Sequence, residues 1–212
     1  MPKLAAFDLD GTLIDSRLDL AGAVNYTRSS MGLEPLDAER IVHFIGGGAA
    51  SLVRRAIADA EIDFDEALHR MRSFYYDHIT DTTTLYNGVS SGLKQLAAAG
   101  TKVALVTNKP AGESEKILRQ LGIFEFFSDL IGGDSDFPLK PEPDGLLSLK
   151  NKYGFADDDC WMIGDHHTDL EAGRRAGFRR IFVTYGFGET GSETPDYTAD
   201  SFSDVNLILS GF

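Results

Sequence analysis

The chain has 212 residues, of which 42% are hydrophobic and 25% are charged. This composition is typical of a globular protein with a sizeable core and argues against a disordered chain. The formal net charge of −13 repels nucleic-acid backbones and acidic membrane surfaces, so we expect neither nucleic acid nor membrane as a partner.

The sequence holds one cysteine, Cys160, in an apolar run. A single thiol cannot form an internal disulfide, which fits a reducing compartment, and Cys160 is expected to be a small buried hydrophobe. No apolar stretch approaches the length of about 18 residues that a membrane span needs. We therefore expect a cytoplasmic protein, either a monomer or a homodimer.

Short apolar runs that alternate with helical patterns predict βαβ units. Such units build an α/β fold with a doubly wound parallel sheet, in which ligands bind beyond the carboxyl ends of the strands. The expected strands cover residues 4–7, 102–106, 130–132, 160–163 and 180–183, and the expected helices cover residues 88–99, 112–121, 143–153, 168–176 and 204–209.

Residues 17–82 interrupt this alternation. Helical patterns follow one another here without a convincing strand, and Gly32, Pro35 and the triplet 46–48 mark turns between them. The simplest interpretation is a helical cap domain, 17–82, inserted into a core domain made of 1–16 and 83–212. The expected cap helices cover 17–31, 37–44, 49–60 and 65–79, and a surface loop is expected at 186–195.

Two carboxylates follow the first expected strand in the segment Asp8-Leu9-Asp10-Gly11-Thr12. Side chains two residues apart at a strand end project to the same side, Gly11 permits a sharp turn, and Thr12 adds a hydroxyl donor. Such a pair can share a divalent cation, or one carboxylate can attack phosphorus while the other moves a proton. A solvated acidic turn explains the same residues taken alone.

Polar segments also end three further expected strands. Thr107 and Asn108 follow the second strand, where a hydroxyl and a backbone N–H suit a phosphoryl oxygen. Lys140 follows the third and can reach a phosphate or hold a carboxylate in place. Asp165 and Asp169 follow the fourth and can face one side of a strand-to-helix junction. Taken separately, a plain turn, a solvated lysine and an acidic helix cap account for these segments.

The order of these motifs resembles the haloacid dehalogenase superfamily of phosphatases, which has a Rossmann-like core. The segments 106–110 (VTNKP), 131–134 (IGGD), 140–147 (KPEPDGLL) and 184–188 (TYGFG) are similar to its phosphoglycolate phosphatase-like members, as is the helical insert. The resemblance implies an enzyme that hydrolyses a small phosphorylated metabolite, with 2-phosphoglycolate as the first expectation.

Members of this subgroup act on several small phosphate monoesters, so other functions stay open. A sugar-phosphate phosphatase or a phosphomutase of the same fold is one alternative, although no basic cap residue typical of a mutase can be identified. A non-catalytic binding or regulatory module is the other, and the intact motif residues argue against it.

The resemblance also implies a role for each carboxylate. Asp8 is the nucleophile that takes the phosphoryl group as an aspartyl-phosphate. Asp10 protonates the leaving oxygen and then activates the hydrolytic water. A carboxylate oxygen of Asp8, the backbone carbonyl of Asp10 and Asp165 hold Mg²⁺. Thr107, Asn108 and Lys140 bind the substrate phosphate, with Thr107 and Lys140 counted among the catalytic residues, and Asp169 supports the site.

Several residues lie outside these motifs. His166 stands where the subgroup commonly has a small hydroxyl residue; we expect Mg²⁺ and not zinc, because the expected ligands are oxygens, and a contact between His166 and substrate stays open. In the insert, Gly47 and Gly48 precede an expected helix whose N-terminus can bind an anion, so both are candidate substrate contacts. Arg54 and Arg55 follow on that helix, and a flexible turn with two solvated arginines explains this segment equally well.

Overall fold

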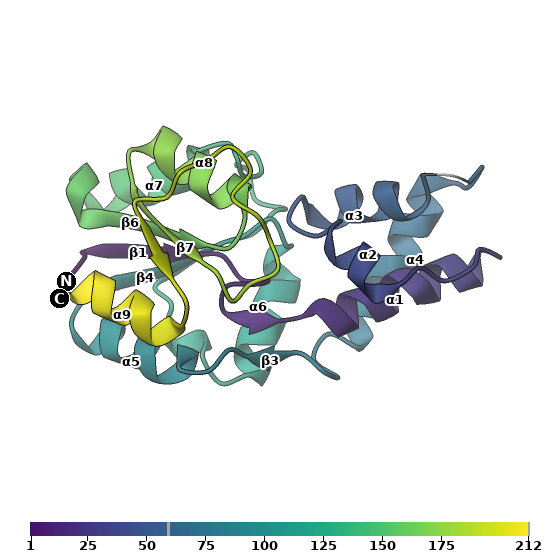
Figure 1. The fold of residues 1–212 in the computed structure, drawn as a ribbon, viewed down its shortest axis with the longest axis horizontal. Helices are drawn as coiled ribbons and strands as arrows, with labels where there is room; N and C mark the ends of the chain where they lie inside the picture. The colour runs from purple at the N-terminus through teal and green to yellow at the C-terminus, as the bar shows by residue number, and fades with distance from the viewer. Residues whose placement is uncertain (59, 212) are drawn as a thin grey trace. The chain divides into compact units, whose positions relative to one another are not determined.

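The computed structural model describes residues 1–58 and 60–211. The chain divides into two compact units (Figure 1). Unit 1 consists of Met1–Asp15 and Leu85–Phe212, and unit 2 consists of Ser16–Thr84. The function of the insert 17–82 as a cap over the site stays a prediction.

A six-stranded sheet lies at the centre of unit 1, with the strand order β5-β4-β1-β6-β7-β8. Every neighbouring pair is parallel. Because β1 lies between β4 and β6, the chain adds strands on both sides of β1, and the predicted doubly wound α/β fold is confirmed. The strands are β1 (Leu4–Phe7), β4 (Lys102–Val106), β5 (Asp129–Ile131), β6 (Cys160–Gly164), β7 (Arg179–Val183) and β8 (Tyr197–Ala199).

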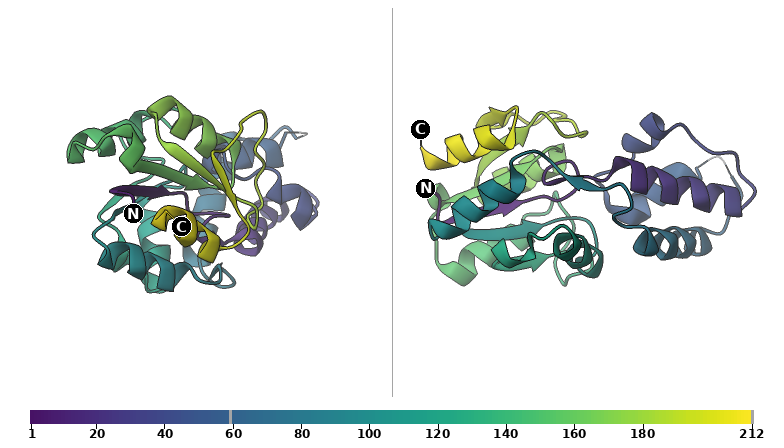
Figure 2. Two further views of the ribbon diagram at one scale, coloured as in Figure 1. Left: turned by 60° about the vertical axis from the view of Figure 1, so that its left-hand side comes forward. Right: turned by 90° about the horizontal axis from the view of Figure 1, so that it is seen from below.

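Helices cover both faces of this sheet. Helices α7 and α8 lie on one face, whereas α5 and α9 lie on the other (Figure 2). Leu4 and Ala6 of β1 belong to the apolar cluster with α7 and α8, and Phe7 stacks on Phe202 of α9 at 5.8 Å. Burial on both faces explains why β1 is apolar throughout. The helices are α5 (Val89–Ala98), α6 (Ala111–Gln120), α7 (Asp144–Tyr153), α8 (His167–Ala176) and α9 (Phe202–Ser210).

Three strands were not predicted. Strands β2 (Ile14–Asp15) and β3 (Thr84–Leu85) pair as a two-stranded sheet where the chain leaves and re-enters unit 1. Strand β8 is an edge strand of three residues. Elements this short carry no recognisable period of two, so the sequence pattern cannot reveal them. Two short 3₁₀ helices, η1 (Phe124–Phe126) and η2 (Asp157–Asp159), were also not predicted.

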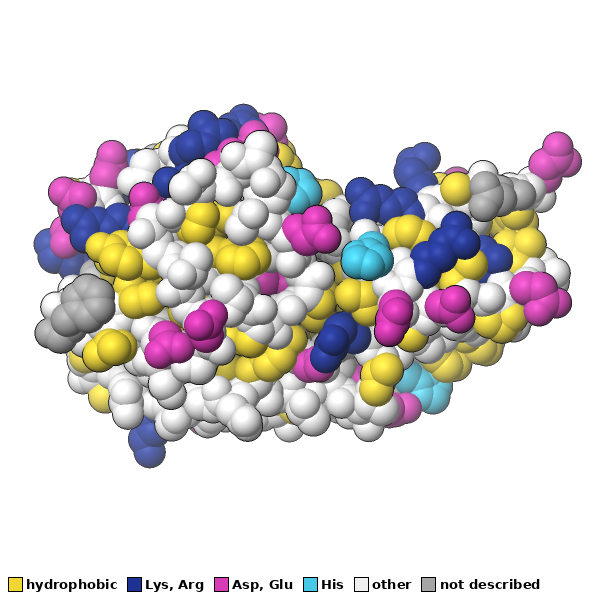
Figure 3. All heavy atoms as spheres, viewed as in Figure 1, with side chains coloured by type: hydrophobic (Ala, Val, Ile, Leu, Met, Phe, Trp, Pro, Cys, Tyr) yellow, Lys and Arg dark blue, Asp and Glu magenta, His cyan; other side chains and the backbone are white. Residues whose placement is uncertain are grey.

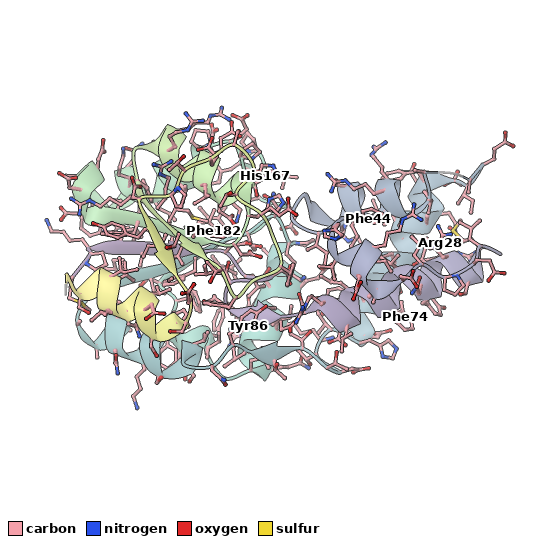
Figure 4. All side chains as sticks on the ribbon, in the orientation of Figure 1. Arg28, Phe44, Phe74, Tyr86, His167 and Phe182 are labelled. Carbon is pink, nitrogen blue, oxygen red and sulfur yellow. The ribbon has the colours of Figure 1, made fainter. Side chains whose placement is uncertain are left out.

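The described part of unit 2 is mainly helical. It contains α1 (Arg17–Ser30), α2 (Ala38–Val42), α3 (Gly48–Ala56) and α4 (Phe64–Asp77). Tyr26 of α1 stacks on Phe74 of α4 with ring centroids 4.0 Å apart; Phe74 is labelled in Figure 4. The helix predicted over 49–60 already ends at Ala56, and residue 59 of that prediction lies outside the described residues.

Charged side chains of both signs share the surface of unit 1 (Figure 3). Arg174 of α8 contacts Glu193 at 3.0 Å, and Arg180 of β7 contacts Asp196 at 2.9 Å. These pairs join the loop before β8 to α8 and β7. Among the described residues, no helix has the length and apolar character needed to cross a membrane.

Candidate active site

Asp8 and Lys140 lie next to each other at the carboxyl edge of the sheet. Asp8 follows β1 directly, and its backbone N–H donates to the carbonyl of Ile163 on β6 at 2.9 Å. Lys140 Nζ donates to Asp8 Oδ1 at 2.8 Å, to Asp169 Oδ1 at 2.6 Å and to the carbonyl of Val106 at 2.6 Å. An ammonium has three protons to donate, so these three bonds fix its place.

Asp165 follows β6 and is held at the same edge. Its Oδ2 accepts the backbone N–H groups of Phe187 at 3.0 Å and Gly188 at 2.8 Å. Thr12 Oγ1 donates to Oδ1 at 3.3 Å. A Cβ at Gly186 would lie 2.4 Å from the Cβ of Asp165, so the absence of a side chain lets this loop approach the carboxylate.

Burial changes the protonation of this cluster. Burial, opposed by Lys140 and reinforced by the charge of Asp169, raises the pKa of Asp8 to about 6. Burial, reinforced by Asp169 and Asp8, raises the pKa of Asp165 to about 8. Burial alone would lower the pKa of Lys140, but Asp169 and Asp8 raise it above its ordinary value. Lys140 therefore favours its charged form, and positive charge nearby favours the ionised form of both carboxyls.

The carboxylates of Asp8, Asp165 and Asp169 form a compact group. Each places an oxygen within 4.8 Å of the other two, and all three residues are buried. When ionised they carry three negative charges, against which Lys140 sets one positive charge. A divalent cation would balance the remainder, and hard cations prefer carboxylate oxygens. Asp169 also accepts from Lys140 and from the N–H of His166, so it holds the lysine as well as facing the other two carboxylates. The donor set fits a divalent metal ion.

Thr107 and Asn108 follow β4 beside this group, and both are buried. The amide of Asn108 makes a reciprocal pair with the backbone of Lys140: Nδ2 donates to the carbonyl at 3.0 Å, and Oδ1 accepts the N–H at 2.8 Å. Thr107 Oγ1 accepts the N–H of Lys109 at 3.3 Å. The contacts of Asn108 favour support of the lysine, and direct phosphate binding by Thr107 or Asn108 stays a prediction.

Lys109 is a site residue that the motif analysis did not single out. Its Nζ lies 2.7 Å from Oδ2 and 3.0 Å from Oδ1 of Asp10. The two side chains are only 5% and 13% exposed. Among the described residues, Asp10 does not belong to the group of three carboxylates. The lysine stands in the VTNKP segment, but its partner becomes visible only because β1 and β4 are neighbours.

Contacts that residues 185–188 make with the site were also not predicted from the sequence. The loop expected at 186–195 as a plain surface loop supplies the N–H donors of Phe187 and Gly188 to Asp165. The glycines of the TYGFG segment were the available signal. A second missed support is Tyr185, whose hydroxyl donates to the carbonyl of Thr12 at 2.9 Å. Tyr185 packs on Tyr86, labelled in Figure 4, with ring centroids 4.8 Å apart.

His166 caps helix α8. Its Nδ1 lies 3.0 Å from Thr168 Oγ1, and its N–H donates to Asp169 Oδ2 at 3.0 Å. The ring of His166 also lies against that of His167, which is labelled in Figure 4, with centroids 4.0 Å apart. These contacts orient the start of α8 and hence Asp169.

The candidate residues of the insert belong to unit 2. Gly47 is the N-cap of α3 and Gly48 is its first residue. Arg54 lies over the ring of Phe64 at 4.2 Å, and Arg55 donates to the carbonyl of His43 at 3.2 Å. Both arginines therefore make contacts within unit 2, and substrate contacts by Gly47 and Gly48 stay predictions.

A doubly wound parallel sheet with two acidic strand ends and a buried lysine at its carboxyl edge defines an α/β enzyme core with an acidic, metal-compatible site. Residues 5–183 match the family of haloacid dehalogenase-like hydrolases. The chain belongs to this family, as its sequence motifs predicted.

The relatives include phosphoglycolate phosphatases of bacteria. The chain is 40% identical to the phosphoglycolate phosphatase of Chromobacterium violaceum over 213 residues, which cover 98% of this chain and 96% of the relative. It is 38% identical to the enzyme of the same name from Aliivibrio fischeri, with the same coverage. A crystal structure of a predicted phosphoglycolate phosphatase from Haemophilus somnus superimposes with a TM-score of 0.93 at 32% identity and covers 97% of both chains. The predicted similarity to this subgroup is confirmed, and so is the prediction of an enzyme of the phosphatase class.

Proposed function

We propose that this protein is a Mg²⁺-dependent phosphatase that hydrolyses a small phosphate monoester, with 2-phosphoglycolate as the first candidate. The observation that carries the proposal is the position of Asp8, which contacts the ammonium of Lys140 and has a carboxylate oxygen of Asp165 within 4.8 Å. A nucleophilic carboxylate in this position has positive charge beside it from the lysine. The names of the most similar relatives support the substrate.

The proposed reaction has two steps. In the first, an oxygen of Asp8 attacks phosphorus, the bond from phosphorus to the leaving oxygen breaks, and Asp10 gives that oxygen a proton. In the second, water attacks the aspartyl-phosphate, Asp10 takes the proton from the water, and inorganic phosphate leaves while Asp8 is restored. One proton carrier therefore serves both steps.

Phosphoryl transfer depends mainly on positioning and charge neutralisation. Lys140 holds Asp8 in place and contributes positive charge next to the attacking oxygen. Asn108 and Asp169 hold Lys140, and Thr107 offers a hydroxyl to a phosphoryl oxygen. Mg²⁺, when bound by Asp8, Asp165 and the carbonyl of Asp10, would neutralise the charge of the phosphoryl oxygens.

The insert and the cellular setting complete the proposal. We assign the choice of substrate to the cap, 17–82, with Gly47 and Gly48 as candidate contacts for a substrate carboxylate. The phosphatase acts in the cytoplasm on a small metabolite, as a monomer or homodimer.

Asp8→Asn tests the proposed nucleophile. The amide has nearly the same shape but cannot attack phosphorus as an anion, so we expect loss of turnover with an unchanged fold. Phosphate release is measured on 2-phosphoglycolate, on a panel of metabolite phosphates and on p-nitrophenyl phosphate, with Mg²⁺ and with EDTA. Mass spectrometry excludes deamidation back to Asp.

Asp158→Asn is the matched control, because the side chain of Asp158 is 88% exposed. It should keep wild-type rates. Steady turnover by Asp8→Asn, or full activity of the wild type in EDTA, contradicts the proposal. A clear preference for another phosphate in the panel would keep the mechanism and replace the substrate.

A further inference from the structure

Asp10 and Lys109 form a buried ion pair, and the proposed reaction gives Lys109 no role. Lys109 Nζ reaches both oxygens of the Asp10 carboxylate, at 2.7 and 3.0 Å. The lysine side chain is only 5% exposed. Both groups lose most of their hydration in this place, and a surface lysine would avoid that cost. The cost of burying this pair points to a role for the position of the Asp10 carboxylate.

The backbone around Lys109 is braced from two sides. Its carbonyl accepts the N–H of Gly133 at 2.8 Å, and its N–H donates to Thr107 Oγ1 at 3.3 Å. A Cβ at Gly133 would lie 2.3 Å from the carbonyl oxygen of Asn108. The turn after β4 and the turn after β5 are therefore in direct backbone contact. The side chain of Lys109 therefore extends from a backbone that hydrogen bonds hold in place.

Lys109 and Lys140 serve different carboxylates. Lys140 contacts Asp8 and Asp169, whereas Lys109 contacts Asp10. Asn108 joins their supports, because it precedes Lys109 in the chain and its amide bonds both backbone groups of Lys140. The proposed nucleophile and the proposed proton carrier are thus each held by a lysine, and the two lysines share one scaffold.

We propose that Lys109 is a positioning residue that holds the Asp10 carboxylate in the orientation needed for proton transfer in both steps. The inference rests on the proposed function, in which Asp10 enters the first step protonated on one oxygen while the other keeps its contact with Lys109, gives that proton to the leaving oxygen and later takes one from water. Asp10 lies within a tight turn, in which the N–H groups of Thr12 and Leu13 donate to the carbonyl of Leu9, and its side chain has two rotatable bonds. A two-point contact with a braced ammonium restricts these rotations. Misplacing a catalytic group by about 1 Å can cost about 100-fold in rate.

The competing role for Lys109 is a direct contact with the substrate. A lysine that binds a substrate anion would change KM or would lower kcat/KM for every substrate that carries that anion. A lysine that orients the proton carrier affects a substrate according to how much its leaving group needs a proton. A comparison of substrates whose leaving groups differ in their need for a proton therefore distinguishes the two roles.

Lys109→Met tests the proposal, because methionine removes the charge and keeps much of the length. The value of kcat/KM reports the steps up to phosphorylation of Asp8. For an alkyl phosphate we expect kcat/KM to fall by about tenfold or more, because the alkoxide needs the proton of Asp10. For p-nitrophenyl phosphate we expect kcat/KM to stay within about threefold, because this leaving group needs little help.

The second step gives an independent readout. With p-nitrophenyl phosphate, Asp8 is phosphorylated rapidly, but water attack still needs Asp10. Lys109→Met should therefore lower kcat and KM together on this substrate and give a burst of nitrophenolate. Acid quenching with labelled substrate should trap a larger fraction of phosphorylated protein than in the wild type. An equal loss of kcat/KM on both substrates, a change confined to KM, or an unchanged phosphorylated fraction overturns the proposal.

Two further variants separate positioning from folding. Lys109→Arg keeps the charge and the capacity for two-point contact, so it should restore part of the alkyl phosphate activity. Lys94→Met makes the same chemical change on the exposed side of α5 and should match the wild type. Thermal unfolding checks that Lys109→Met is folded at the assay temperature; if it is not, Lys109→Gln, measured at lower temperature, decides by the same ratio of the two substrates. A wild type that hydrolyses neither phosphate refutes the proposed function itself, whereas an active wild type with parallel losses refutes only the role of Lys109.

Discussion

Lys140 Nζ and Asp169 Oδ1 lie 2.6 Å apart, in side chains that are 4% and 1% exposed. The ammonium cannot move toward solvent, because the carbonyl of Val106 and Asp8 hold it from other directions. Asp169 therefore places Lys140, and Lys140 places Asp8. The contact joins the first turn of α8 to the segment between β5 and α7, so it also stabilises the core.

Lys140→Met should impair both stability and activity. Removing one partner from a buried ion pair leaves the carboxylates uncompensated, and such changes cost about 3–5 kcal/mol of unfolding free energy. We expect kcat to fall by about 100-fold or more, since charge next to the transferred phosphoryl group is lost. Denaturant unfolding in EDTA and steady-state kinetics in Mg²⁺ measure the two effects.

Lys3→Met is the control for this change. Lys3 lies 2.9 Å from Asp159, but the lysine side chain is 59% exposed, and exposed pairs contribute at most about 1 kcal/mol. Equal losses of stability in the two variants would show that burial of the Lys140 pair has no energetic consequence.

The metal-free protein should become less stable as the pH rises from about 4 to about 8. Burial raises the pKa of Asp8 to about 6 and that of Asp165 to about 8, from an ordinary value of 3.8. Between the ordinary and the raised pKa, the folded state binds more protons than the unfolded state, so stability falls with rising pH. The melting temperature in EDTA, followed across this range, measures the trend.

Asp165→Asn should flatten that trend, because the amide does not ionise. In the wild type, Mg²⁺ should reverse the trend, since the metal binds the ionised carboxylates and releases their protons. Calorimetric titrations in buffers of different ionisation enthalpy count the protons released. A melting temperature in EDTA that rises steadily from pH 4 to 8 would contradict the prediction.

Asp19 should stabilise unit 2 at neutral pH. Its carboxylate accepts the N–H and hydroxyl groups of Thr82 and Thr83, at distances from 2.6 to 3.1 Å. Burial works against ionisation, but these hydrogen bonds prevail and lower the pKa of Asp19 below 3.8. Asp19→Asn should therefore cost about 1–3 kcal/mol at pH 7, since hydrogen bonds to a charged group are lost.

The stability that Asp19 contributes should decrease at low pH. A lowered pKa gives stability that is full above the ordinary value of 3.8 and is lost as the pH falls through the lowered value. The difference between wild type and Asp19→Asn should thus be constant from pH 5 to 7 and shrink below about pH 4. Urea unfolding at several pH values measures it, with Asp77→Asn, at an exposed position of α4, as the control.

Gly47→Ala tests the proposed role of the insert in substrate choice. Gly47 has φ −92°, which any residue adopts, and a new Cβ would lie 2.9 Å from Ser51 Oγ, the end of a side chain that can rotate. Gly48 is less suitable, because its φ is +80°. If Gly47 contacts the substrate, the added methyl group should raise KM for 2-phosphoglycolate by about tenfold or more.

Hydrolysis of p-nitrophenyl phosphate by Gly47→Ala should change little, because this substrate lacks the carboxylate that the contact would recognise. Gly22→Ala is the matched control, since a Cβ at Gly22 would meet no atom within 4 Å. If both substrates lose rate in parallel, the glycine turn has only a structural role.

Local patterns determined the elements that are buried on both faces. Strands β1 and β4 have the bounds that their apolar runs predicted, because a central parallel strand must be apolar throughout. Strand β8 was missed because an edge strand of three residues needs no such pattern. The insert was predicted as helical, but α3 is shorter than its pattern.

The amino-acid sequence alone predicted the family, the parallel sheet and the set of polar strand ends, since each of these can be recognised from short segments and from their order along the chain. The pairing of those groups became apparent only from the folded chain. Lys109 and Asp10 are 99 positions apart, and Lys140 and Asp8 are 132 positions apart. Such pairs arise because parallel strands bring their carboxyl ends to one edge, where burial removes water and leaves each charge to find a partner within the protein.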